Sequence, residues 1–120
     1  MREVLSVLAA LRVRIGTLGS EADLQEKVAA TLVAGGIAFE REQRIAPGCR
    51  IDFLTDVGVG IEVKRGKQSG VLPQLERYAA AEAVRALVLL TERRMAVPAA
   101  VGGKPCAAVI LSYLWGVATR

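Results

Sequence analysis

The segment 84–91 constrains the fold of this chain most strongly, because its residues VRALVLLT form a near-continuous apolar run. A strand this apolar is buried on both faces, which is typical of parallel strands that lie between layers of helices. The segment therefore predicts an α/β domain in which helices cover both sides of a sheet.

Capping residues, glycines and a proline mark three helices. The first is expected over residues 3–14. The second begins after Ser20, which can cap it, and ends at the glycine pair 35–36. The third contains Pro73, which fits the first turn of a helix because its missing N–H has no partner there in any case.

The strands are indicated by a two-residue apolar period that begins after the second helix. A meander of three strands is expected, over 37–44, 50–55 and 59–64. A loop or short helix over 95–101 and a last apolar strand over 107–114 follow the buried strand.

This order of elements predicts one three-layer α/β domain over residues 1–120, with a mixed β-sheet. Its core spans about 20–91, preceded by the N-terminal helix 3–14 and followed by a C-terminal strand region, 105–116. A chain of 120 residues is long enough to bury such a core without disulfides or a structural metal. No internal repeat or Pro/Ser-rich linker divides it.

The absence of histidine excludes several chemistries. Ser-His-Asp and Cys-His hydrolysis and zinc sites built on histidine all need an imidazole. The 16 Lys and Arg residues exceed the 12 Asp and Glu residues, and the net charge of +4 favours an anionic partner. A catalyst in this chain has to use carboxylates, lysine, a metal or backbone groups.

The chain is expected to be cytoplasmic, with no membrane association. Its two cysteines, Cys49 and Cys106, form no CxxC motif, which favours a reducing compartment. Residues 4–11 lie between charges in the wrong order for a signal peptide. The uncharged run 105–119 is shorter than the about 20 residues that cross a bilayer.

The segment 50–64, RIDFLTDVGVGIEVK, carries the most chemical information. If residues 56–58 form a three-residue hairpin loop, Asp52 lies opposite Glu62, and Lys64 shares their face. Alternation then turns a second set of side chains toward the core, namely Ile51, Phe53, Val59, Ile61 and Val63. Gly60, opposite Leu54, leaves room for a ligand to approach the backbone.

Two facing carboxylates need a compensating charge. Their β-carbons would lie about 4.5 to 5.5 Å apart, where like charges destabilise a sheet. A divalent cation meets this need, and carboxylate oxygens are hard ligands that suit Mg²⁺ or Mn²⁺. The alternative is a solvated hairpin face on which Asp52 and Glu62 pair with Lys64 and Arg50.

The arrangement Asp52, then Glu62-Val63-Lys64 ten residues later, resembles the D…ExK signature of the PD-(D/E)XK nuclease superfamily. The strings RIDFL, IEVKRG and QLERY are similar to archaeal Holliday junction resolvase-like, single-strand-specific and phage-related endonuclease domains. The resemblance covers about residues 20–91, with Ile51 in place of the family's proline. It implies a restriction-endonuclease-like core of order αβββαβ.

The resemblance also implies residue roles. Asp52 and Glu62 would hold the metal, Mg²⁺ or Mn²⁺, together with the backbone carbonyl of Val63. Lys64 would act on the attacking water or on the developing negative charge; its alternative is an ion pair with either acid. Gln74 would lie beside the site, with Tyr78 one helical turn further on.

An acid on the first core helix completes the site in some members of the superfamily. Glu21 is the best match and Glu26 is the second choice. Glu21 has an equal alternative as a first-turn acid that offsets the helix dipole.

Basic residues around the hairpin are the expected nucleic-acid contacts. The set is Arg50, Arg65, Lys67 and Arg77, with Tyr78 beside them, and Arg41 and Arg44 lie on the flanking strand. The alternative is scattered surface charge, because acidic residues interleave with this set at 40, 42 and 76.

The leading hypothesis is a metal-dependent endonuclease that hydrolyses DNA, with branched or flapped DNA as candidate substrates. One alternative is a nuclease-fold module that binds DNA without cutting it. Another is a subunit of a larger restriction or repair system. By analogy with junction-cleaving enzymes, which need two cuts, a homodimer is a candidate assembly.

Overall fold

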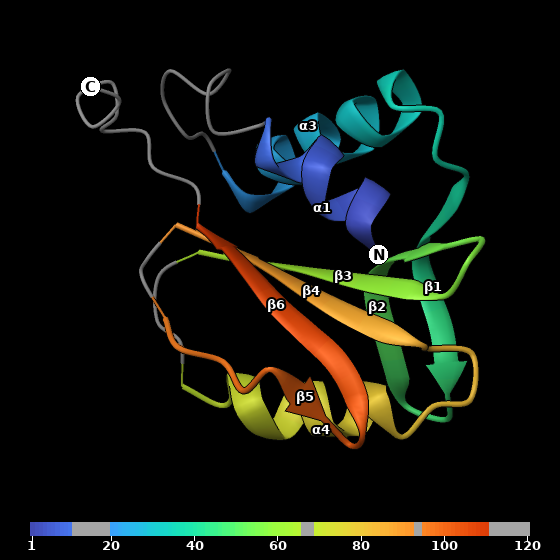
Figure 1. Cartoon of the computed structure of the whole chain (residues 1–120), viewed down its shortest axis with the longest axis vertical. Coiled ribbons are helices and arrows are strands. Elements are labelled where there is room, and N and C mark those ends of the chain that lie inside the picture. The colour runs from blue at the N-terminus through green and yellow to red at the C-terminus, as the bar shows by residue number, and fades with distance from the viewer. Residues whose placement is uncertain (11–19, 66–68, 93–94, 111–120) are drawn as a thin grey trace.

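A six-stranded mixed sheet lies between two layers of helices in the computed structural model (Figure 1). The structure describes residues 1–10, 20–65, 69–92 and 95–110. Helices α1 (Arg2–Ala9) and α3 (Glu21–Ala34) cover one face, and α4 (Val71–Ala79) covers the other. The predicted α/β class and the mixed sheet are confirmed.

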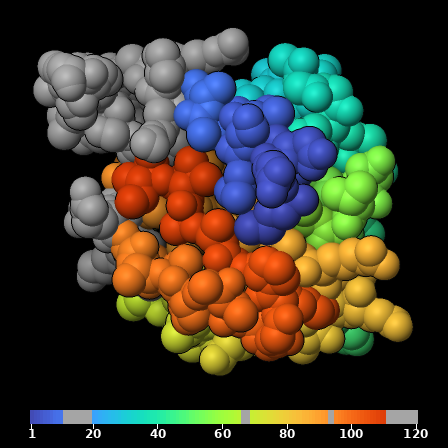
Figure 2. Space-filling model, viewed as in Figure 1, coloured from blue at the N-terminus to red at the C-terminus, as the bar shows by residue number. Residues whose placement is uncertain are grey.

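The strands run in the order β1-β2-β3-β4-β6-β5 across the sheet. β1 pairs with β2 and β2 with β3 in antiparallel fashion, whereas β3, β4 and β6 are parallel neighbours, and β5 is antiparallel to β6. The bounds are β1 Phe39–Ala46, β2 Cys49–Thr55, β3 Val59–Lys64, β4 Ala86–Thr91, β5 Ala100–Val101 and β6 Lys104–Ile110. Figure 2 shows β5 and β6, in orange and red, at the surface between α1 and α4.

Strand β4 is buried along its whole length, as its composition predicts. Ala86, Val88 and Leu90 join the apolar cluster under α1 and α3. Leu87 and Leu89 join the cluster under α4. Because alternate side chains enter different clusters, the strand is apolar at every position from 86 to 90, and only its last residue, Thr91, is polar.

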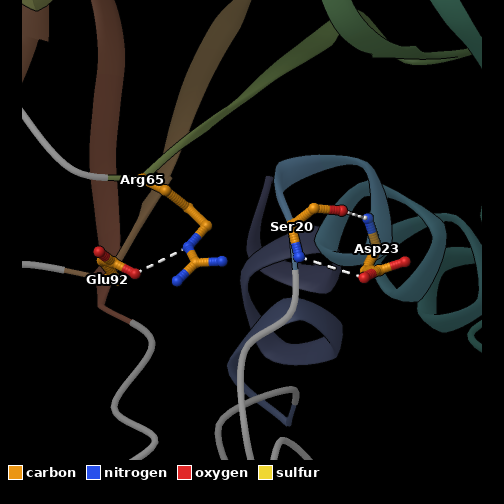
Figure 3. Close-up of polar contacts among 4 residues, drawn as sticks. All are labelled: Ser20, Asp23, Arg65 and Glu92. Atoms are coloured by element: carbon orange, nitrogen blue, oxygen red, sulfur yellow. Dashed lines mark hydrogen bonds and ion pairs between the residues drawn. The ribbon is translucent and has the colours of Figure 1, made fainter.

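Helix α3 begins at a capping box, as the sequence around Ser20 indicates (Figure 3). The Asp23 amide donates to the Ser20 hydroxyl and the Ser20 amide donates to the Asp23 carboxylate, both at 3.1 Å. Its buried face repeats at helical spacing through Leu24, Val28 and Leu32. This cap fixes where the helix starts relative to the sheet.

Several predicted boundaries differ from the structure: β1 spans Phe39–Ala46 rather than 37–44, and β2 begins at Cys49 rather than at 50. Helix α1 ends at Ala9, and residues 11–14 of the predicted helix 3–14 lie outside the described residues. β6 begins at Lys104 rather than at 107, because β5 extends the antiparallel pairing to Lys104 and Pro105. The rest of the predicted C-terminal strand region, 111–116, lies outside the described residues. Within the described ranges, no helix is both long and apolar enough to cross a membrane.

Candidate functional site

The β2–β3 hairpin has the predicted register near its turn. Phe53 pairs with Ile61 and Leu54 with Gly60, so the residue numbers of each pair sum to the expected 114. Gly58 ends the turn with φ +90°, a conformation that side chains rarely adopt. This register directs Asp52 toward Glu62.

At Asp52 and Glu62, side-chain carboxylates accept the hydrogen bonds between the two strands. The Asp52 amide donates to Glu62 Oε1 at 3.3 Å, and the Val63 amide donates to Asp52 Oδ2 at 2.9 Å. Each carboxylate therefore bonds to the backbone of the opposite strand. The structure brings Asp52 and Glu62 together at the open end of the hairpin, as the spacing predicts. The Val63 carbonyl was expected to hold the metal; the contact that Val63 makes with Asp52 uses its amide N–H instead.

The prediction that Ile51 shares a face with Phe53 is wrong. Phe53 packs in the cluster under α1 and α3, whereas Ile51 packs in the cluster under α4. The alternation is interrupted where Glu42 of the neighbouring strand has φ +47° and where the β2–β3 ladder ends. A local distortion of this kind turns successive side chains away from strict alternation.

This rotation also changes the role expected for Gly60. A β-carbon at Gly60 would lie 2.5 Å from Ile51 Cδ1 and 3.2 Å from Leu87 Cδ2. The space above the glycine is therefore filled by core side chains and is not open to a ligand. Gly60 permits close packing of β3 against its neighbours.

Glu62 is a buried carboxylate whose side chain belongs to the α4 side of the sheet, with 6% of the residue exposed. Burial and the charge of Asp52 raise its pKa from 4.5 to about 7, although hydrogen bonds from Tyr78 and the Asp52 amide oppose the rise. A carboxylate in this state gains from any cation that binds beside it.

Asp52 is half-buried, and its pKa is also raised. Burial is the largest cause; the Val63 amide and the Lys64 charge oppose it, and the charges of Glu21 and Glu42 add to it. Within the described residues no ion pair joins Lys64 to Asp52 or Glu62. Lys64 acts on the two acids from a longer distance, so the ion-pair alternative expected for it does not hold in this structure.

Gln74 and Tyr78 support the site from α4. Gln74 Nε2 donates to the Tyr78 hydroxyl at 2.9 Å, and that hydroxyl donates to the Arg50 carbonyl at 3.2 Å. The same hydroxyl lies near enough to Glu62 to lower the pKa of that carboxyl. Burial and the Glu62 charge raise the pKa of Tyr78, which keeps its proton on the hydroxyl. With 2% exposure, Tyr78 is an internal support, and its burial does not suit the nucleic-acid contact expected of it.

The two candidate helix acids have different surroundings. Glu26 is 70% exposed and binds Arg41 at 2.9 Å, and Arg41 also lies over the Phe53 ring. Glu21, at the first turn of α3, is exposed, and its charge raises the pKa of Asp52. Of the two helix acids, Glu21 is therefore the one whose charge acts on Asp52.

The expected basic contacts are dispersed around this end of the sheet. Arg50 is exposed and lies 4.0 Å from Glu42, and Arg77 is exposed in the last turn of α4. Arg65 directly follows Lys64 and binds Glu92 at 2.8 Å. Lys67 lies outside the described residues.

Glu42 and Glu92 are not among the site residues predicted from the sequence. Nothing in the sequence marks the positive φ of Glu42, because a glutamate rarely adopts it. Glu92 directly follows the apolar run 84–91, and the parallel pairing of β3 with β4 brings it beside Arg65.

The donor set suits a hard divalent cation. Two carboxylates with raised pKa meet at one point, and each uses one oxygen in the backbone bonds described above. Magnesium keeps several waters and takes one or two carboxylates, so a pair is a sufficient protein contribution. In the described part of the chain, no cluster of three or more Asp, Glu, Cys or His side chains with metal-binding geometry is found.

Comparison of the chain with protein-family models, curated proteins and solved structures gave no match.

Proposed function

We propose that this protein is a metal-dependent nuclease that hydrolyses DNA phosphodiester bonds and has a restriction-endonuclease-like core of the PD-(D/E)XK type. The observation that carries the proposal is the meeting of Asp52 and Glu62, both with raised pKa, at the open end of a hairpin that continues into Lys64 and Arg65. The order of one helix, three strands, a helix and a strand from α3 to β4 also supports it.

Each residue of the proposed site has a role that follows from its position. Asp52 and Glu62 would hold Mg²⁺ or Mn²⁺, which supplies Lewis-acid activation of the phosphodiester when it is bound. Lys64, on the strand that carries Glu62, would stabilise negative charge that develops on the phosphate. Gln74 orients the Tyr78 hydroxyl, which lies beside the Glu62 carboxylate and favours its charged form.

Acidic charge around Asp52 fits this chemistry. Glu21 and Glu42 both raise the pKa of Asp52 from outside the contact pair. Their charges add to the negative potential that attracts a cation to Asp52 and Glu62.

The proposal is tested by incubating the purified protein with duplex, single-stranded, flapped and four-way DNA, and with RNA. Each substrate is tested with Mg²⁺, with Mn²⁺ and with EDTA. We expect cleavage with metal, and we expect Asp52→Asn to lower its rate by at least about 100-fold, because a ligand matters at least as much as its outer-shell partners.

The matched control is Asp56→Asn, which makes the same change on the same hairpin at the exposed turn. We expect this variant to cut like the parent chain. Equal cutting by Asp52→Asn would point to a contaminating nuclease and overturn the proposal. Tight DNA binding without cutting by the parent chain would favour a non-cutting module or a subunit of a larger system.

The substrate panel also separates the finer possibilities. Preference for four-way or flapped DNA would indicate recognition of branched structures. Paired cuts across a four-way junction need two active sites, so the same samples are examined by sedimentation for the proposed homodimer.

A further inference from the structure

Arg65 and Glu92 form an ion pair at the ends of two parallel strands. Lys64 and Thr91 are register partners, so Arg65 and Glu92 follow at the same edge of the sheet. Arg65 Nε donates to Glu92 Oε1 at 2.8 Å, and the two side chains are 27% and 15% exposed (Figure 3). This is the most shielded of the three ion pairs among the described residues.

The geometry of the pair leaves one edge of the guanidinium available. The bond to Glu92 uses Nε, and within the described ranges the two terminal nitrogens have no hydrogen-bond acceptor. Figure 3 shows one of these nitrogens directed toward the side on which α3 begins. A guanidinium that is held through Nε can still offer two parallel N–H donors to a phosphate.

The Arg65–Glu92 ion pair adds little to the stability of the folded protein. Partly exposed ion pairs contribute about 0 to 1 kcal/mol. Fixing a long side chain costs rotamer entropy, and an arginine that is already fixed loses less of it on binding a phosphate. The cost of ordering Arg65 has therefore been met in the folded protein before a ligand arrives.

We propose that Glu92 is a positioning residue that holds Arg65 as a phosphate-binding fork directly after Lys64, so that Arg65 anchors a backbone phosphate of DNA at this end of the sheet. The inference rests on the proposed function for its ligand, because DNA is the phosphodiester considered there. It adds a residue, Glu92, to the site and a specific task, backbone anchoring, to Arg65.

The test measures binding of fluorescein-labelled duplex and single-stranded DNA by anisotropy, in EDTA and at several salt concentrations. We expect Arg65→Gln to weaken binding about tenfold and to reduce the salt slope by about 1, as loss of one phosphate contact does. The control Arg85→Gln removes the same charge beside Gly58, at the turn of the hairpin, and should change binding less.

Glu92→Gln gives the decisive result, because two explanations predict opposite signs. If Glu92 is merely a negative charge near DNA, its removal strengthens binding. If it positions Arg65, its removal weakens binding by roughly threefold, and this loss is smaller in the Arg65→Gln background. Glu82→Gln, an exposed acid, is the control for charge alone, and thermal unfolding checks that each variant is folded.

Several results would overturn the inference: no DNA binding by the parent chain, unchanged binding by Arg65→Gln, or equal or tighter binding by Glu92→Gln. An additive double variant would overturn it as well. Failure of the proposed function looks different: the chain would bind DNA with this dependence on Arg65 and Glu92 but would not cut it with any metal.

Discussion

The two ends of the β2–β3 hairpin are built differently. At the turn, the Gly58 amide donates to the Thr55 carbonyl and the Val59 amide donates to the Thr55 hydroxyl at 2.9 Å. The Gly58 carbonyl in turn accepts from the Arg85 amide at 2.7 Å, which ties the turn to β4. Every one of these contacts is neutral.

At the open end, the corresponding contacts use charged groups. The carboxylates of Asp52 and Glu62 replace backbone carbonyls as acceptors, and burial raises the pKa of both. The turn end therefore stabilises the fold, whereas the open end brings two partly or fully buried acids together. The difference indicates that selection for folding explains the turn and does not explain the acids.

The largest expected effect is on the pH dependence of stability, when the charge of Glu62 is removed from the open end of the hairpin. Glu62 has a pKa of about 7 in the folded chain and an ordinary value of 4.5, so the folded state binds more protons between those pH values. The free energy of unfolding therefore falls as pH rises through this window, by on the order of 3 kcal/mol in metal-free buffer. Glu62→Gln should remove most of this fall, while abolishing metal-dependent cleavage.

The measurement is urea unfolding at pH 4 to 8 in EDTA, for the parent chain and Glu62→Gln. The variant should match the parent near pH 4 and be more stable at pH 8. Added Mg²⁺ should raise the stability of the parent at pH 8, because a ligand of the folded state shifts the equilibrium. Parallel pH profiles for the two proteins would mean that the acids are already neutralised.

The fold was predictable because its signals are local. The capping box at Ser20, the apolar strand β4 and Pro73 in the first turn of α4 each specify an element within a few residues. The hairpin register followed from one glycine, Gly58, because a three-residue loop leaves a single pairing.

The site was predictable in its acids and less so in its surroundings. Asp52 and Glu62 meet because register is a backbone property, but Ile51 faces α4 because of a distortion beside Glu42 that no local pattern marks. Tyr78 was expected to contact nucleic acid, yet its spacing of three residues from Leu75 on α4 equally fits the buried face of that helix. Periodicity gives a face and does not tell which layer covers it.

The next effect tests the turn end. Gly58→Ala should lower stability by about 2 kcal/mol at every pH, because a side chain at φ +90° is strained and its β-carbon would meet Arg85 Cγ at 2.9 Å. The control is Gly48→Ala, also at positive φ but with open space around it, which should cost less. Urea unfolding at pH 5 and pH 8 measures both variants. A loss that depended on pH would show that the two ends are coupled.

The smallest expected effect comes from removing a neutral hydrogen-bond acceptor, the Thr55 hydroxyl, at the turn end of the hairpin. Thr55→Val keeps the shape of a side chain that is 3% exposed but removes the acceptor of the Val59 amide, so stability should fall by about 1 kcal/mol without a change in its pH profile. Thr31→Val, on α3, removes a hydroxyl that donates to the Lys27 carbonyl at a half-exposed position and should cost less. Urea unfolding resolves the two values. Equal losses would mean that the Val59 amide finds another acceptor, and the neutral contacts of the turn would then not be what makes that end stable.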